Sequence, residues 1–297
     1  MPDIHNLDIA SVRMHIQCNH AGIALDDDPA YVTFFVSEPV AAADMRISLE
    51  TTPLPDTGRM NKIFDSEQAW AMFRDGSDYC VLYNPPVSEH PLWLARMNHD
   101  IAEVTVYCSD YLAIEKDGRP FLSNPVRYPL DQILLMYHLA QRAGALVHAA
   151  GIIIDKKGYI FPGRSGAGKT TLSRQFVKKA YADMLSDDRV AVRMTDNAFR
   201  VFGTPWPGEG GIAMNKSVVL EGIFFLAHAD DNRIEQITQR EAFESLIAVV
   251  SVPWYDREIM PHILFFCEEL TSRVPAYRLH FRPGTEVVDI LENFLSA

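Results

Sequence analysis

The pattern of hydrophobic and polar positions changes near residue 128. Up to that point, short runs rich in β-branched and aromatic residues alternate with clusters of Pro, Asp and Gly, which is typical of strands joined by turns. Representative runs are Tyr31–Val36, Asp78–Tyr83 and Glu103–Cys108. We therefore predict a mainly antiparallel β domain over residues 1–128.

After residue 128, helices alternate with strands. Apolar residues recur at helical spacing between Pro129 and Gly144, which suit the first turn and the end of a helix. Three further segments of the C-terminal half are predicted to be helical: 241–250, 257–270 and 284–295. Because β-like runs lie between the helices, we predict an α/β domain over residues 129–297.

An apolar strand and a short turn come directly before a glycine-rich segment of this domain. The strand spans residues 145–154, the turn Asp155–Gly158, and a second strand Tyr159–Phe161. A turn of this length indicates a β-hairpin. The hairpin therefore feeds the chain into the segment that starts at Gly163.

The eight residues from Gly163 to Thr170 read Gly-Arg-Ser-Gly-Ala-Gly-Lys-Thr and match the phosphate-binding pattern G-x-x-x-x-G-K-[ST]. The motif follows a strand and precedes an amphipathic helical segment, Thr170–Lys179, as this pattern requires. Glycines let backbone N–H groups turn inward, and the helix N-terminus adds a positive dipole, so the loop can hold a polyphosphate. The predicted nucleotide-binding residues are Gly163, Arg164, Ser165, Gly166, Ala167, Gly168, Lys169, Thr170 and Thr171.

Two residues of the loop have specific predicted roles. Lys169 would reach the β- and γ-phosphates, and the hydroxyl group of Thr170 would bind Mg²⁺. A glycine-rich turn without a ligand is the alternative for the loop, and Arg164 could equally point to solvent. Since no motif that reads a base is visible, ATP is the default nucleotide.

Two adjacent carboxylates, Asp187 and Asp188, follow an apolar run and precede a β-like one. Adjacent side chains of an extended segment point to opposite sides, so one can face a metal ion or an acceptor hydroxyl while the other is held elsewhere. Near Mg²⁺ and a triphosphate, a carboxylate can accept the proton of an attacking hydroxyl group. The alternatives are a solvated turn, or a metal ligand without a base function.

Three other polar residues are candidates for the same chemistry. His148 interrupts an apolar strand, where a histidine is often a core residue, but the hairpin brings its strand beside the one that feeds the loop. Residues 204–216 are rich in Pro and Gly, and Glu209 and Lys216 are groups there that can bind metal or phosphate. A rigid structural corner is the alternative for this segment.

Charge and composition narrow the classes of partner. The 297 residues include 27 Lys and Arg against 39 Asp and Glu, a net charge of -12, which disfavours nucleic acid. The four cysteines are scattered without a C-x-x-C pattern, which indicates reduced, buried thiols. No apolar run approaches the ~18–20 residues of a membrane helix, and the N-terminus lacks a signal-peptide pattern. We therefore expect a cytoplasmic protein with no membrane partner.

Two segments together resemble the catalytic domain of the bacterial HPr kinase/phosphorylase family: HAAGIIIDKKGYIFPGRSGAGKTTL, which starts at His148, and LSDDRVAV, which contains Asp187 and Asp188. The order of these groups is also similar to that of HPr-kinase-like proteins of uncertain substrate, including kinases that modify a serine of peptide precursors. The resemblance implies a fold related to phosphoenolpyruvate carboxykinase for residues 129–297, with a β-rich part before it.

The resemblance also implies roles for individual residues. Asp187 matches the family's general base, with Asp188 supporting it or binding metal, and His148 matches the active-site histidine. Thr170 replaces a metal-binding serine, and Glu209 lies in the loop region where the family has a metal-ligating glutamate. The predicted catalytic residues are Asp187, His148 and Lys169, and the predicted metal ligands are Thr170, Asp188 and Glu209.

We therefore predict an ATP- and Mg²⁺-dependent kinase that transfers a phosphoryl group to a hydroxyl acceptor, either a serine of a protein or peptide or a small molecule. The β domain of residues 1–128 would then recognise a substrate or partner. The alternative is a nucleotide-binding regulatory or assembly protein without phosphotransfer, which presents that acidic domain to a partner. The sequence does not identify the acceptor and leaves a homo-oligomer open.

Overall fold

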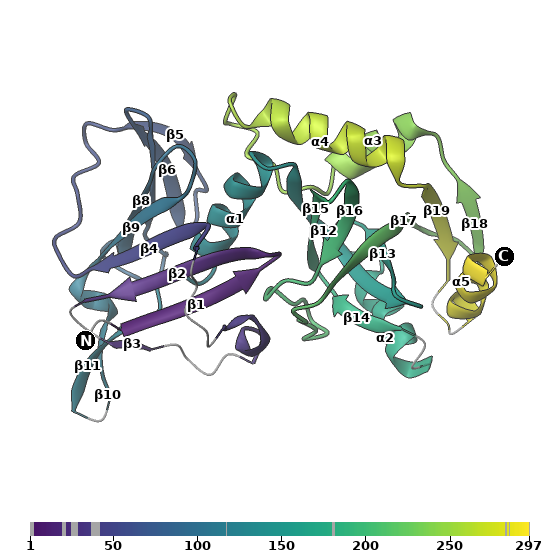
Figure 1. Cartoon of the computed structure of the whole chain (residues 1–297), viewed down its shortest axis with the longest axis horizontal. Coiled ribbons are helices and arrows are strands. Elements are labelled where there is room, and N and C mark those ends of the chain that lie inside the picture. Colours follow the sequence, from purple (N-terminus) through teal and green to yellow (C-terminus); the bar gives the residue numbers. More distant parts are fainter. Residues whose placement is uncertain are drawn as a thin grey trace. The chain divides into compact units, whose positions relative to one another are not determined.

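The structure is a computed structural model of the chain (Figure 1). The residues that it describes are 3–19, 22–24, 29–36, 42–116, 118–179, 182–282, 284 and 286–296. The chain divides into two compact units. Unit 1 comprises Met1–His138 and Trp254–Asp256, and unit 2 comprises Leu139–Pro253 and Arg257–Ala297.

Unit 1 is built on an eight-stranded sheet with the order β1-β2-β4-β9-β8-β7-β6-β5. Its strands are β1 (Asp3–Ile9), β2 (Val12–Cys18), β4 (Met45–Glu50), β5 (Asn61–Asp65), β6 (Trp70–Asp75), β7 (Asp78–Tyr83), β8 (Trp93–Met97) and β9 (Glu103–Cys108). Neighbouring strands are antiparallel except in the pairs β2–β4 and β4–β9. The prediction of a mainly antiparallel β region is thus confirmed for this sheet.

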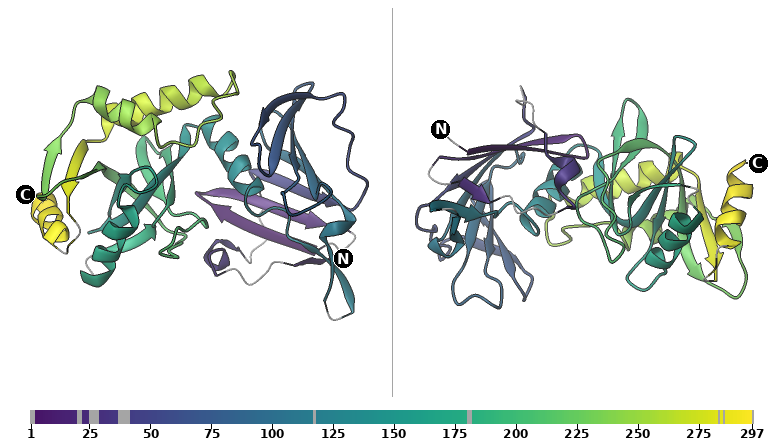
Figure 2. Two further views of the ribbon diagram at one scale, coloured as in Figure 1. Left: turned by 180° about the vertical axis from the view of Figure 1, so that it is seen from behind. Right: turned by 90° about the horizontal axis from the view of Figure 1, so that it is seen from below.

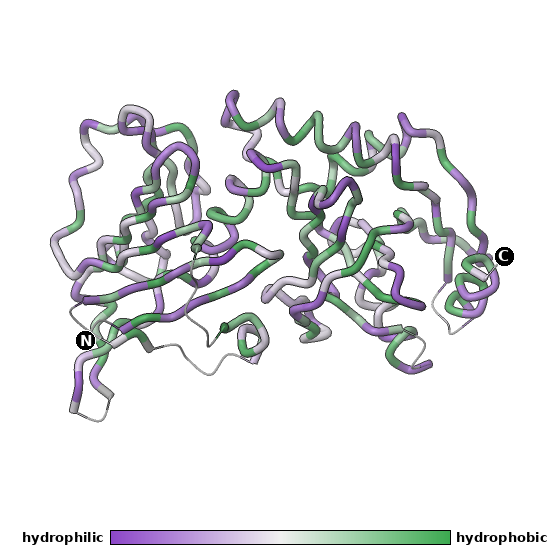
Figure 3. The backbone as a smooth tube through the Cα atoms, in the orientation of Figure 1, coloured by the Kyte–Doolittle hydropathy of each residue, from purple (hydrophilic) through white to green (hydrophobic). Residues whose placement is uncertain are grey.

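The core of this sheet follows the period-two pattern of strands. In β2, alternate residues from Val12 to Cys18 are buried, while Arg13 between them is exposed. Figure 3 shows the alternation of hydrophobic and hydrophilic residues along these strands. A smaller sheet consists of β10 (Ala113–Lys116), β11 (Arg119–Ser123) and β3 (Gly22–Ala24), and a 3-10 helix, η2, spans Asp110–Leu112.

One predicted strand of unit 1 is wrong. Within residues 31–36, Val32–Phe34 form a 3-10 helix, η1, instead of a strand, and Phe35 makes an isolated bridge to Leu7. The N–H of Phe34 donates to the carbonyl oxygen of Tyr31 at 2.9 Å, and the Phe34 ring is fully buried. A short turn anchored by one aromatic side chain therefore replaces the extended conformation that its aromatic and β-branched composition favours.

The end of unit 1 lies ten residues beyond the predicted boundary, because most of α1 (Leu130–Ala140) belongs to it. Tyr137 of this helix packs edge-on against Tyr79 of β7, with ring centroids 4.8 Å apart. The hydroxyl group of Tyr137 lies 3.1 Å from the sulfur of Met72 in β6. The helix is thus a core element of the β unit, although its sequence pattern resembles that of the following α/β segment.

Residues 254–256 also join unit 1, far from its other residues in the sequence. The Tyr255 ring stacks on Phe64 of β5 with centroids 4.2 Å apart, and Trp254 meets the same ring edge-on at 5.9 Å. Asp256 is buried, with Arg74 of β6 4.0 Å away. These contacts cannot be read from periodicity, because they join segments almost 200 residues apart.

Unit 2 is a mixed α/β structure. Its sheet has the order β13-β12-β15-β16-β17-β19-β18, and β14 pairs with β12. Because β13 also pairs with β17, the strands β12, β15, β16, β17 and β13 form a closed ring of pairings. The strands are β12 (Gly144–Ile154), β13 (Lys157–Pro162), β14 (Asp183–Ser186), β15 (Arg189–Thr195), β16 (Ala198–Phe202), β17 (Ser217–His228), β18 (Arg233–Gln236) and β19 (Ala276–Phe281).

The helices of unit 2 agree with the sequence pattern within a few residues. They are α2 (Lys169–Lys179), α3 (Gln239–Ile247), α4 (Met260–Arg273) and α5 (Glu286–Ser296). Thr238 and Glu241 form a capping box at the start of α3. Helices α2 and α5 contact each other (Figure 2).

A hydrophobic cluster holds α2 against the strands that lead into it. Leu172 and Phe176, four residues apart on one face of α2, are buried in this cluster with Phe161 of β13. The rings of Phe161 and Phe176 have centroids 5.7 Å apart. This packing sets the position of the start of α2 relative to the end of β13.

The described part of the chain contains no helix that is long and apolar enough to cross a membrane. The four cysteines are buried free thiols, as predicted.

Candidate active site

A glycine-rich loop of six residues connects β13 to α2. Gly166 and Gly168 have φ values of 81° and 98°, which residues with a side chain rarely adopt. The N–H of Ala167 donates to the carbonyl oxygen of Arg164 at 3.0 Å and closes the loop on itself. The predicted order of hairpin, loop and helix is present, and the free N–H groups of the helix N-terminus follow the loop directly.

Lys169, the first residue of α2, is 6% exposed. Its ammonium group donates to the carbonyl oxygens of Gly163 at 2.8 Å and Arg164 at 3.3 Å. Burial lowers the pKa of Lys169, while the nearby Asp188 carboxylate acts in the opposite direction. Carbonyl oxygens carry no formal charge and compensate the ammonium group only in part, so an anion that enters the loop would gain a strong electrostatic interaction.

Two residues from distant strands support the loop, and sequence reasoning missed both. The Nε2 atom of His228, at the end of β17, lies 3.1 Å from the carbonyl oxygen of Gly166. The His228 ring also stacks on Phe281 of β19, with centroids 5.9 Å apart. A Cβ atom added to Gly168 would lie 2.5 Å from Cζ of Phe281, so the loop packs closely on that ring.

This packing predicts that Gly168→Ala weakens nucleotide binding more than Gly166→Ala. Both changes carry the backbone penalty of a positive φ, about 1–3 kcal/mol. Only Gly168→Ala also collides with Phe281, since a Cβ atom at Gly166 meets nothing within 4 Å. We expect Gly168→Ala to raise the Kd for ATP by at least about tenfold more than Gly166→Ala, as measured by calorimetry. Equal effects would show that the Phe281 contact does not shape the loop.

The adjacent carboxylates turn to opposite sides, and Asp187 is the buried one, 1% exposed. Its Oδ1 accepts backbone N–H groups from Gly208 at 2.9 Å and Ile212 at 3.3 Å, and its Oδ2 accepts from Gly210 at 2.6 Å. A Cβ atom at Gly210 would lie 2.5 Å from Oδ2, so only glycine permits this approach. The resemblance implies a general base at Asp187, whereas in the structure both oxygens hold the loop of residues 208–212.

Asp188 points the other way and meets the histidine. Its Oδ1 accepts a hydrogen bond from Nε2 of His148 at 2.8 Å. This hydrogen bond is the main cause of a lowered pKa for Asp188, and the charges of Arg189 and Lys169 act in the same direction against burial. The Ser186 hydroxyl accepts the backbone N–H of Asp188 at 3.3 Å, which helps to fix the turn.

One cavity of about 390 Å³ gathers most of the predicted residues. Its lining residues are His148, Ser165, Gly166, Gly168, Lys169, Thr170, Thr171, Asp188, Gly208 and Glu209. The predicted residues outside this lining are Gly163, Arg164, Ala167 and Asp187. The structure therefore brings the lysine, the histidine and one carboxylate together, and places the other carboxylate behind the cavity wall.

The oxygen donors of the cavity fit a magnesium ion. Thr170, Asp188 and Glu209 line it together, and hard oxygen ligands are those that Mg²⁺ prefers. Within the described ranges, no group of three His, Cys, Asp or Glu side chains forms a metal site by itself. In nucleotide sites, Mg²⁺ usually binds one or two protein carboxylates and takes its other ligands from phosphates and water.

Lys216 is not part of the cavity lining. Its ammonium group pairs with Oδ2 of Asp183 at 3.2 Å. The backbone of Lys216 accepts the N–H of Gly203 at 3.1 Å. These contacts of Lys216 agree with the alternative of a rigid structural corner. Lys216 closes the base of the loop that carries Glu209.

Asp187→Asn is expected to destabilise the protein by about 2–4 kcal/mol, because a buried carboxylate with three backbone donors is replaced by an amide whose NH₂ faces one of them. The free energy of unfolding, measured in urea, checks this expectation. Asp188→Asn is the matched control, since its half-exposed pair with His148 should cost about 1 kcal/mol or less. Equal losses for the two variants would contradict the anchoring role of Asp187.

Comparisons with known proteins add little to this geometry. No protein-family model and no curated protein matches the chain. Among solved structures, the HPr(Ser) kinase/phosphatase from Coxiella burnetii is similar over 51% of this chain and 90% of its own, with 15% sequence identity and a TM-score of 0.30. A likeness of this degree transfers neither a fold nor a chemistry.

Proposed function

We propose that the chain is an ATP- and Mg²⁺-dependent kinase that transfers a phosphoryl group to a hydroxyl acceptor, with an HPr-kinase-like domain in unit 2. One observation carries this proposal. A loop lysine, a carboxylate hydrogen-bonded to a histidine, and further oxygen donors line the same cavity. Phosphoryl transfer needs these groups, because it depends on phosphate positioning, charge neutralisation and an oriented acceptor.

The loop and the start of α2 bind the phosphates in this proposal. Their inward N–H groups and the helix dipole favour negative charge. Lys169 turns from the carbonyl oxygens of Gly163 and Arg164 to the β- and γ-phosphates. Its burial strengthens this interaction, because a nearly enclosed cation is poorly screened by solvent.

Asp188 takes the role of the base, which the resemblance gives to Asp187. Its Oδ1 is occupied by His148, which leaves Oδ2 for the acceptor hydroxyl. As the acceptor oxygen bonds to the γ-phosphorus, the bond from that phosphorus to the β–γ bridging oxygen breaks, ADP leaves, and the hydroxyl proton passes to Asp188. A lowered pKa keeps this carboxylate ionised at neutral pH, and a loose transition state needs only modest help from a base.

Thr170 and Glu209 would hold Mg²⁺ beside the phosphates, where the ion neutralises part of their charge. Asp187 acts indirectly in this scheme. By binding the N–H groups of Gly208 and Gly210 on either side of Glu209, it sets where that glutamate stands. In this scheme Asp188 accepts the proton, and Asp187 positions the loop that carries Glu209.

Incubation of a host lysate with the purified chain, γ-labelled ATP and Mg²⁺ tests the proposal, with mass spectrometry to identify the labelled product. The control is Lys169→Met. A labelled protein, peptide or small molecule that requires Lys169 supports a kinase. Tight ATP binding without a labelled product would favour the alternative, a nucleotide-binding regulatory or assembly protein.

A further inference from the structure

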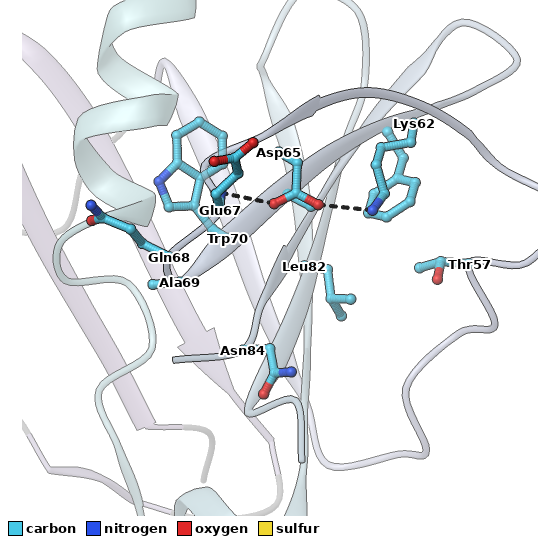
Figure 4. Close-up of a pocket in the computed structure, with 11 residues that line it drawn as sticks. Thr57, Lys62, Asp65, Glu67, Gln68, Ala69, Trp70, Leu82 and Asn84 are labelled. Atoms are coloured by element: carbon cyan, nitrogen blue, oxygen red, sulfur yellow. Dashed lines mark hydrogen bonds and ion pairs between the residues drawn. The ribbon is translucent and has the colours of Figure 1, made fainter. Parts of the chain in front are cut away.

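Unit 1 contains a cavity of about 480 Å³ that the proposed chemistry does not use (Figure 4). It is lined by Thr57, Lys62, Asp65, Glu67, Gln68, Ala69, Trp70, Ala71, Phe73, Leu82 and Asn84. A volume of this size lies within the ~300–1,000 Å³ range of ligand pockets. Its lining residues indicate the kind of ligand that it can bind.

The floor of the cavity is apolar and its rim is polar. Ala71 and Phe73 of β6 belong to a buried cluster against which Leu82 of β7 packs. At the rim, Lys62 donates to Asp65 at 2.8 Å, and Figure 4 shows this pair along one side of the cavity. An apolar floor below hydrogen-bonding groups suits a side chain that carries a polar end.

The charges of the rim disfavour an anionic ligand. Lys62 is the single cation among the lining residues, and Asp65 already neutralises it. Glu67 adds a second, exposed carboxylate to the lining. The cavity is therefore neutral to negative, unlike the phosphate loop of unit 2, and favours a neutral or cationic group.

The cavity borders the free edge of the large sheet. Strand β5 is last in the sheet order, and within the described residues it pairs only with β6. The register shifts between Lys62 and Phe64, so Lys62 and Asp65 both reach the cavity. Its outer edge leaves main-chain groups for an added strand, and pockets beside such an edge receive alternate side chains of a bound peptide.

The whole net charge of the chain lies in unit 1. Residues 1–138 and 254–256 contain 9 Lys and Arg and 21 Asp and Glu, so their net charge is 9 − 21 = -12. The remaining residues, 139–253 and 257–297, contain 18 of each and have no net charge. The excess of carboxylates in unit 1 attracts a basic peptide and repels an acidic one.

We propose that β5 and the adjacent cavity form a docking site for an extended, Lys- or Arg-rich peptide segment. The segment adds to β5 as a further strand and places alternate side chains over the apolar floor and beside the Glu67 carboxylate of the rim. We further assign the docked segment to the phosphoryl acceptor, and this assignment alone rests on the kinase function proposed above. The acceptor class is then a basic protein or peptide and not a small molecule.

Fluorescence anisotropy with the full chain and no nucleotide tests the docking site. The probe is a labelled peptide of alternating Lys and Val residues. We expect it to bind at least about tenfold more tightly than a Glu-Val peptide, because of charge, and than a Lys-Pro peptide, because proline cannot form the strand ladder. Equal affinities for the Lys-Val and Lys-Pro peptides would show that binding depends only on non-specific electrostatic attraction, and would overturn the proposal.

A cavity-filling variant tests the place of binding. Asn84 is exposed and lines the cavity, so Asn84→Trp should block it and weaken Lys-Val binding about tenfold. Val87→Trp is the control, because Val87 is 96% exposed and lies outside the lining. Unchanged binding by Asn84→Trp, with both variants folded by circular dichroism, would rule out the cavity.

Hydrogen exchange tests strand addition separately. The bound Lys-Val peptide should slow exchange of the amides of β5, Asn61–Asp65, while the Lys-Pro peptide should not. Binding without this protection would exclude the added strand. Because no nucleotide is present in any of these experiments, their failure leaves the kinase proposal standing, and absence of phosphoryl transfer leaves the docking site standing.

Discussion

Replacing Asp188 by Asn is expected to lower the rate of phosphoryl transfer by about 10²–10⁴-fold, the usual contribution of a general base. Asparagine keeps the size of the side chain and still has an oxygen for the hydrogen bond from His148, but it cannot accept the acceptor proton. ATP binding should change little, since the phosphate loop and Lys169 remain in place. Single-turnover transfer of labelled phosphate and calorimetric titration with ATP measure the two effects separately.

Asp187→Asn is the informative control for this experiment. It alters the neighbouring carboxylate by the same atoms, yet its expected effect is on stability and on the position of the loop that carries Glu209. A large loss of transfer in a stable Asp187→Asn protein, together with an active Asp188→Asn protein, would return the base role to Asp187. Joint loss of ATP binding and transfer in Asp188→Asn would show that Asp188 mainly holds the metal.

Lys169→Met is expected to raise the Kd for ATP by about 10–100-fold and to abolish measurable transfer, because charge-assisted contacts to the phosphates are lost. The unliganded protein should unfold at the same temperature as the wild type or at a higher one. Burial lowers the pKa of Lys169, so the folded state disfavours the charged form that the unfolded state keeps at neutral pH. Methionine removes that cost and retains most of the volume.

The lowered pKa of Lys169 also sets the sign of the pH dependence of folding stability. Below the lowered pKa the lysine is charged in both states and destabilises the fold, and this cost disappears as pH rises to the ordinary value. Thermal melts of wild type and Lys169→Met, without nucleotide, should therefore converge at high pH. A Lys169→Met protein that is markedly less stable at neutral pH would show that the ammonium group is mainly a structural contact for Gly163 and Arg164.

The local elements of the site could be predicted from the sequence. The hairpin itself is such a case, although its turn is shorter than the predicted Asp155–Gly158: Lys157 already pairs with Ile154, and Asp155 and Lys156 have the φ values of 49° and 65° that a two-residue turn between twisted strands requires. Leu172 and Phe176 reach the core because they are four residues apart on a helix. Such interactions depend on neighbours within one turn or one hairpin.

Other features depend on partners far away in the chain. The packing of Tyr255 on Phe64 and of Tyr137 on Tyr79 places residues 254–256 and most of α1 in unit 1, against the predicted boundary. The contact of His228 with the glycine-rich loop has no local signal either, because 62 residues separate it from Gly166.

By itself, the amino-acid sequence determined a hairpin-fed glycine-rich loop, its helix, and the fact that two adjacent carboxylates face opposite ways. Only the tertiary structure decided which carboxylate binds the loop of residues 208–212 and which faces the cavity. The N–H groups of Gly208, Gly210 and Ile212 bind Asp187 across more than twenty residues, and His148 reaches Asp188 across 40. A hydrogen bond acts over about 3 Å, so its partners are settled by how distant segments pack and not by the residues next to them.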